Sequence, residues 1–77
     1  MVIDLILTDT HDGYTGEVPS IKGCECWAHT EEEVLSKSIE LVQFYLGIPD
    51  DKKIKYDKAR KSSNKSIYKL IINKDPQ

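Results

Sequence analysis

Apolar and polar residues alternate along residues 2–8, with Ile3, Leu5 and Leu7 on one side and Asp4 on the other. Successive side chains of an extended chain point to opposite faces, so this alternation predicts a strand with one apolar face. A strand of this kind is typical of an antiparallel sheet that is covered on one side only.

The residues that follow predict a hairpin. Asp12-Gly13 is a strong turn signal between two strands, because glycine tolerates positive φ. The second strand is expected over residues 14–18 and stops at Pro19, which has no N–H to donate to a sheet. Gly16 within this strand indicates a bulge or a close approach by another backbone or side chain.

A third strand is expected over residues 24–28. Its period of two places Cys24, Cys26 and Ala28 on one face and Trp27 on the other. We expect the small residues to face a helix, because their size lets the helix pack closely. Trp27 is then expected on the open face of the sheet.

The chain next takes the spacing of an amphipathic helix over residues 31–46. Thr30 and Glu33 match a capping box, in which the threonine hydroxyl accepts from the Glu33 amide and the Glu33 side chain reaches back to the Thr30 amide. Gly47 is a natural stop, because glycine readily adopts the left-handed conformation that ends many helices. The expected buried stripe consists of Leu35, Ile39, Val42 and Leu46.

The remaining chain divides into a polar part and an apolar part. Residues 50–65 are polar and basic, and we expect weak structure there with a short extended piece at residues 54–56. Residues 66–73 are rich in β-branched and aromatic side chains, which predicts a last strand. The fold class is therefore α+β, a single βββαβ domain with an antiparallel sheet and one helix packed on one face. The domain spans residues 1–77, with a core from residues 1–48 and 66–74 and a basic connecting segment from residues 50–65.

The length of the chain bounds its stability and its location. A domain of 77 residues buries only about 60% of its unfolded surface, so we expect a homodimer or homotetramer. No stretch approaches the roughly 20 apolar residues of a membrane span, and the opening residues lack the basic start of a signal peptide. A cytoplasmic location is expected.

The net charge of −2 conceals a strong asymmetry between the two parts of the chain. Residues 1–50 carry a net charge of −8, and residues 51–77 carry a net charge of +6. Such a division can steer association with a charged partner. It equally suits head-to-tail contacts between copies of the same chain, or a surface that is simply solvated.

The cysteines are the main candidates for chemistry, and we interpret them as structural. A structural zinc site needs four ligands, and Cys24 and Cys26 have only His29 and His11 to complete a set. Packed, reduced thiols fit this spacing better. The acidic residues around them argue against a nucleophilic cysteine, which needs an electropositive setting. We expect no catalytic residue, no metal, no cofactor and no enzymatic activity.

The basic segment supports a second function class. Basic side chains can bind the phosphates of nucleic acids without sequence preference. The segment contains only one aromatic residue, Tyr56, and shows no helix-turn-helix or ribbon pattern. Its candidate phosphate contacts are Lys52, Lys53, Lys55, Lys58, Arg60, Lys61 and Lys65.

Residues 12–46 carry a distinctive pattern of turn residues. It runs through Asp12-Gly13-Tyr14, then Val18-Pro19-Ser20-Ile21-Lys22-Gly23-Cys24, and Ala28-His29-Thr30 before an acidic helix start. This pattern resembles that of the HicB antitoxin family and its small relatives, and the βββαβ order is similar to their N-terminal domain. Ser20, Lys22 and Ala28-His29 depart from the family pattern, at positions that shape turns. HicB antitoxins commonly continue into a DNA-binding domain, which we do not expect here.

The resemblance implies a binding role. HicB antitoxins bind a small basic ribonuclease toxin, HicA, and cover its catalytic surface, and the acidic first part of this chain would suit such a partner. Two alternatives remain: a nucleic-acid-binding protein that uses residues 52–65, and a stand-alone homo-oligomer or inhibitor of an unrelated enzyme. The candidate partner-binding residues are Tyr14, Glu17, Glu25, Trp27 and Phe44.

Overall fold

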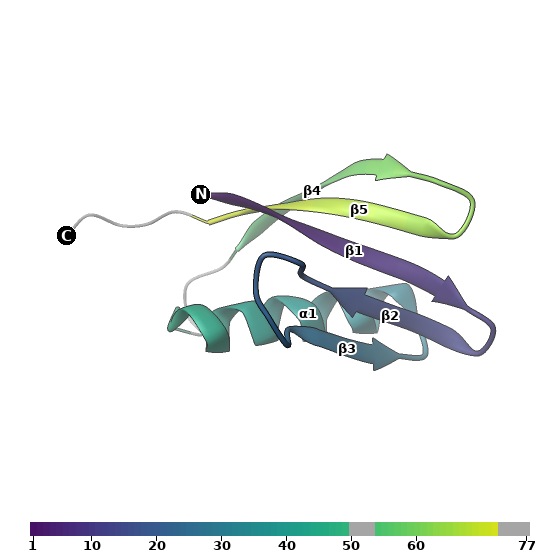
Figure 1. Cartoon of the computed structure of the whole chain (residues 1–77), viewed down its shortest axis with the longest axis horizontal. Coiled ribbons are helices and arrows are strands. Elements are labelled where there is room, and N and C mark those ends of the chain that lie inside the picture. The colour runs from purple at the N-terminus through teal and green to yellow at the C-terminus, as the bar shows by residue number, and fades with distance from the viewer. Residues whose placement is uncertain (50–53, 73–77) are drawn as a thin grey trace.

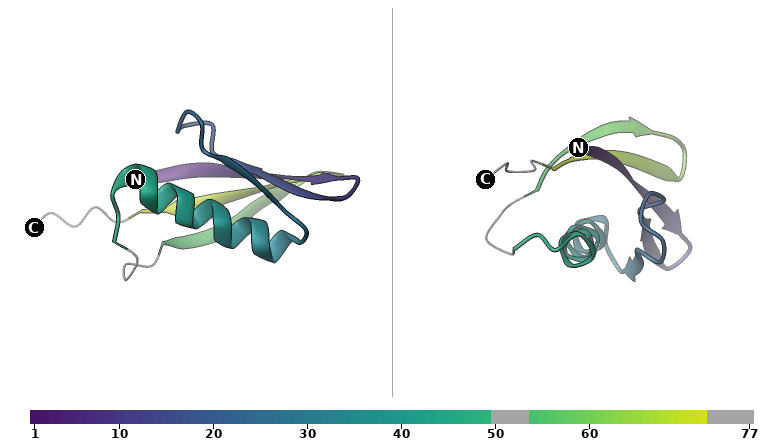
Figure 2. Two further views of the ribbon diagram at one scale, coloured as in Figure 1. Left: turned by 90° about the horizontal axis from the view of Figure 1, so that it is seen from below. Right: turned by 60° about the vertical axis from the view of Figure 1, so that its left-hand side comes forward.

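A computed structural model of the chain describes residues 1–49 and 54–72. The elements are β1 (Val2–Thr10), β2 (Gly13–Glu17), β3 (Glu25–Ala28), α1 (Glu31–Leu46), β4 (Lys55–Lys61) and β5 (Lys65–Ile71). The five strands form one antiparallel sheet in the order β3-β2-β1-β5-β4 (Figure 1). The helix α1 lies across one face of this sheet, against β1, β2 and β3 (Figure 2). The predicted α+β class, with one helix on one face of an antiparallel sheet, is confirmed.

The structure adds the strand β4 to the predicted order, which becomes βββαββ. The expected extended piece is confirmed at residues 55–56, but the expectation of weak structure is wrong for residues 57–61, because residues 55–61 pair with β5 along the edge of the sheet. Every side chain of β4 is exposed, so the strand shows no apolar alternation to reveal it in the sequence. Residues 50–53 of the predicted connecting segment and residues 73–74 of the predicted core lie outside the described residues.

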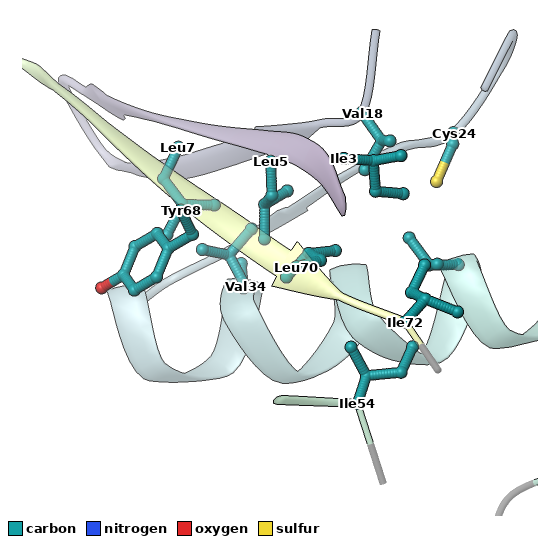
Figure 3. Packing of buried hydrophobic residues seen from close by; sticks show 12 residues of the cluster. Ile3, Leu5, Leu7, Val18, Cys24, Val34, Ile54, Tyr68, Leu70 and Ile72 are labelled. Atoms are coloured by element: carbon teal, nitrogen blue, oxygen red, sulfur yellow. The ribbon is translucent and has the colours of Figure 1, made fainter. Parts of the chain in front are cut away.

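The apolar core lies between α1 and the sheet. The predicted apolar face of β1 is confirmed, because Ile3, Leu5 and Leu7 are buried, and Leu70 of β5 packs beside them (Figure 3). The other buried apolar residues of this cluster include Val18, Cys24, Ala28, Val34, Val42, Ile54, Tyr68 and Ile72.

The helix begins and ends at the predicted residues. The Thr30 hydroxyl accepts a hydrogen bond from the Glu33 amide at 3.1 Å, and Gly47 is left-handed with φ 69°. The second half of the capping box differs, because the Glu33 carboxylate accepts from the Thr30 hydroxyl at 3.3 Å rather than from its amide. Local sequence therefore determines both helix ends.

The buried face of α1 is rotated from the predicted stripe. Of the predicted stripe, Val42 is fully buried, Leu35 and Ile39 are partly buried against the core, and Leu46 is 39% exposed. Val34 and Ser38 are fully buried instead. The cause is the close contact between α1 and β2. Gly16 of β2 faces Ser38, and a side chain at Gly16 would place its Cβ only 2.3 Å from the Ser38 Oγ. The helix can lie close to β2 because a glycine faces a serine there, and this contact favours the rotation that turns Ser38 inward.

The close approach predicted at Gly16 is confirmed, and so is the position of the small residues of β3. The Cys26 Sγ lies 3.2 Å from the Ser38 Oγ and 3.9 Å from the Val34 carbonyl oxygen. Cys24 and Ala28 are buried on the same side. These small side chains let α1 lie close to the edge of the sheet.

Replacing Gly16 with Ala should destabilise the fold by about 1–3 kcal/mol, because the added methyl group overpacks the contact with Ser38. Urea unfolding followed by circular dichroism measures this change. The exposed Ser36→Ala is the matched control and should change stability by less than about 0.5 kcal/mol. A Gly16→Ala variant as stable as this control would contradict the close approach.

The double variant Gly16→Ala/Ser38→Ala tests the contact itself. The Ser38 oxygen is the nearest atom to the added methyl group, so the double variant should lose less stability than the two single changes together. Additive changes would show that the two positions do not touch.

Candidate protein-binding surface

The sheet face opposite α1, here called the open face, has no described helix or strand packed on it (Figure 2). Directly paired residues of neighbouring antiparallel strands point to the same face, so the strand register assigns its residues. They are Val2, Asp4, Ile6 and Thr8 of β1, Thr15 and Glu17 of β2, Glu25 and Trp27 of β3, Lys55, Asp57 and Arg60 of β4, and Lys65, Ile67, Lys69 and Ile71 of β5.

The centre of the open face is aliphatic. Ile6 pairs with Ile67, and Val2 pairs with Ile71, across the ladder between β1 and β5. Val2 is 58% exposed and the three isoleucines are partly exposed. Between these two pairs, the Lys69 ammonium group donates to the Asp4 carboxylate at 2.6 Å.

The two borders of the open face carry opposite charges. Glu17 and Glu25 lie directly opposite each other on β2 and β3, and no described cation is within ion-pair distance of either. Like charges in this position repel. On the other side of the aliphatic centre, β4 places Lys55, Asp57 and Arg60 on the same face, where the two bases outnumber the one acid. The face therefore runs from acidic through aliphatic to basic.

Trp27 is an exposed but well-supported aromatic residue. Its side chain is 40% exposed and packs over Gly13, where an added Cβ would lie 2.5 Å from the indole Cζ2. The His29 ring meets the indole edge to face, with 4.6 Å between ring centres. Gly13 has a negative φ, so it is needed for the space it leaves to Trp27 and not for the positive φ assumed from the Asp-Gly turn.

Trp27 lies at the acidic end of the sheet. The β1–β2 turn, the end of β3 and the start of α1 all meet at this end (Figure 1). These elements carry the carboxylates of Asp9, Asp12, Glu31, Glu32 and Glu33. Asp9 and Glu31 are on the helix side, where they line a cleft together with Lys61 and Lys65 of the β4–β5 hairpin.

The five predicted partner-binding residues do not form one surface. Glu17, Glu25 and Trp27 share the open face. Tyr14 lies on the helix side and lines a small cleft together with Glu31. Phe44 is 78% exposed on the outer surface of α1. The aliphatic centre was not predicted, and Arg60 was predicted only as a phosphate contact. Both share a surface with the acidic pair only through the long-range pairing of β1, β5 and β4.

The candidate phosphate contacts are divided between the two faces of the β4–β5 hairpin. Lys55, Arg60 and Lys65 are on the open face, whereas Lys58 and Lys61 are on the helix side. The Lys58 ammonium group lies 3.5 Å from a Glu31 carboxylate oxygen. Lys52 and Lys53 lie outside the described residues.

Tyr68 connects the hairpin to the start of α1. Its hydroxyl donates to the Glu31 carboxylate at 2.9 Å. Burial, followed by this hydrogen bond to a carboxylate, raises the pKa of Tyr68 from 10.0 to about 12.

A raised pKa in the folded state means that the neutral Tyr68 stabilises the fold below pH 10, and that this contribution is lost as the pH rises from about 10 to about 12. Ultraviolet titration of the tyrosines should show one late-ionising group that is absent in Tyr68→Phe. The exposed Tyr56→Phe is the control and should retain it. A late group that persists in Tyr68→Phe would contradict the assignment.

The two cysteines are free thiols on the helix side of β3. Burial, and then the neighbouring Cys26, raises the pKa of Cys24. The His29 ring meets the Trp27 indole edge to face. Within residues 1–49 and 54–72, no group of three or more histidine, cysteine, aspartate or glutamate side chains is arranged to hold a metal ion.

Comparison of the chain with protein-family models, with curated proteins and with solved structures finds no match in any of the three. Among the described residues, no helix is both long and apolar enough to cross a membrane.

Proposed function

We propose that the protein is a HicB-like binding module that neutralises a small basic ribonuclease toxin in the cytoplasm, and that it catalyses no reaction itself. The observation that supports this proposal best is Trp27, an exposed indole held in place by Gly13 and His29 at the acidic end of the sheet. The pattern of residues 12–46 that resembles HicB antitoxins agrees with it.

Preorganisation and charge both suit this protein to binding a basic partner. Tryptophan is enriched among the few residues that contribute most of the energy of a protein interface. An indole that is already fixed before binding loses little conformational entropy on contact. The carboxylates of the first half of the chain attract a basic partner and favour rapid encounter.

The nucleic-acid alternative has less support. Its basic residues lie on both faces of the β4–β5 hairpin, and Lys58 is paired with Glu31.

The proposal is tested by capture of a host partner on the tagged chain, followed by expression of that partner alone and together with this chain. The expected partner is a small basic ribonuclease that arrests growth alone and is harmless in the presence of this protein. Trp27→Ala should weaken the purified complex by about thirtyfold or more, because an interface hot spot contributes at least about 2 kcal/mol.

Tyr56→Ala is the matched control for loss of an exposed aromatic ring, since Tyr56 is 47% exposed on the edge strand β4. It should leave both the affinity and the growth rescue unchanged. Equal affinity of the wild-type protein and a folded Trp27→Ala variant would contradict the proposed contact.

A further inference from the structure

Across its strands, the open face carries rows of residues in which an acid on one side and a base on the other lie at equal distances from a central aliphatic pair. One row runs through β2, β1, β5 and β4 and reads Glu17, Ile6, Ile67, Arg60. Read from the other end, the acid takes the place of the base, and each isoleucine takes the place of the other. Two copies of such a row can therefore face each other so that each acid lies opposite a base and each isoleucine lies opposite an isoleucine.

The neighbouring positions follow the same rule. Asp4 on β1 pairs with Lys69 on β5, so reversal exchanges an acid and a base. Val2 and Ile71 are the next pair along these strands, so reversal exchanges two aliphatic side chains. The complementarity thus continues along the ladder from Ile6 to Val2, and it ends at the pair of Thr8 and Lys65 in the other direction.

We propose that the open face binds a second copy of this chain, through a twofold axis that runs parallel to the strands between β1 and β5. Rotation about this axis turns the second sheet over, so that β1 faces the partner's β5 and β2 faces the partner's β4. Ile6 then contacts the partner's Ile67, and Glu17 lies opposite the partner's Arg60. Each contact occurs twice, as in other twofold interfaces.

Two packed sheets can be related by a twofold axis along the strands or by one across them, and the charges of the open face favour the axis along the strands. A twofold axis across the strands would place β2 on the partner's β2 and β4 on the partner's β4, which brings like charges together. The proposed axis instead gives the repelling pair Glu17 and Glu25 an arginine from the partner. It also places each Asp4 near the partner's Lys69.

Packing favours the same arrangement. Face-to-face sheets lie about 10 Å apart with nearly aligned strands, which is the relation that this axis produces. A chain of 77 residues with one helix on one side of its sheet gains buried apolar area when a second sheet covers Val2, Ile6, Ile67 and Ile71. Trp27 lies on β3, one strand outside the row of Glu17, Ile6, Ile67 and Arg60, so the inference goes beyond the proposed contact at Trp27.

Sedimentation velocity of the wild-type protein and three charge variants tests the interface. The wild-type protein should be a dimer. Glu17→Lys and Arg60→Glu should each raise the dissociation constant by about tenfold or more, because each opposes like charges across the axis. The double variant Glu17→Lys/Arg60→Glu should recover the dimer, since the exchanged charges again match. Both positions are exposed, and circular dichroism checks that each variant is folded.

Phe44→Ser is the control, because it removes the most exposed of the large apolar side chains from α1, away from the open face. It should leave the dimer unchanged. A monomeric wild-type protein, a Glu17→Lys variant that associates as strongly as the wild-type protein, a double variant without recovery, or dissociation by Phe44→Ser would each overturn the proposal. None of these results depends on a toxin partner, so failure here is distinguishable from failure of the proposed function.

Discussion

The contact between Gly16 and Ser38 determines how the helix meets the sheet. With no side chain at Gly16, the Ser38 hydroxyl fits against β2 and reaches the Cys26 thiol on β3. The helix is thereby held over the β1–β2–β3 side of the sheet, with Val34, Ser38 and Val42 inward. Bulkier residues at these positions would push the helix outward and open the core, because protein interiors are close-packed.

A helix held on that side leaves β5 and β4 to extend past it. Tyr68 and Lys58 reach back to the start of the helix and share the Glu31 carboxylate, which joins the hairpin to α1 by polar contacts. Ile54 and Ile72 fill the opposite end of the core (Figure 3). The single helix completes only the inner side of the sheet, and the outer side keeps its aliphatic centre and its two charged borders. One face thus stabilises the fold, and the other is available for contact.

Features set by local sequence could be predicted, and features set by tertiary contacts could not. The ends of α1 follow from Thr30 and Gly47, and the apolar face of β1 follows from its alternation. The edge strand β4 gives no alternation, because both of its faces are exposed. Leu46 fits the helical period but is exposed, because the Gly16–Ser38 contact rotates the helix.

In the candidate surface, too, only the features set by local sequence could be predicted. Trp27 could be assigned to the open face from the period of β3 alone. The meeting of Ile6 with Ile67, and of both with Arg60, depends on pairing between the two ends of the chain, which no local pattern encodes. Gly13 could be recognised as special, but the reason is the indole of Trp27 that packs on it from another strand.

The division of the sheet into a folding face and a contact face is tested most directly by isotope-filtered nuclear Overhauser spectroscopy on an equal mixture of labelled and unlabelled chains. We expect intermolecular signals between the methyl groups of Ile6 and the partner's Ile67, and none from the buried methyl groups of Leu5 or Leu70. Intermolecular signals from Phe44 on the outer side of the helix, or none at millimolar concentration, would contradict the account.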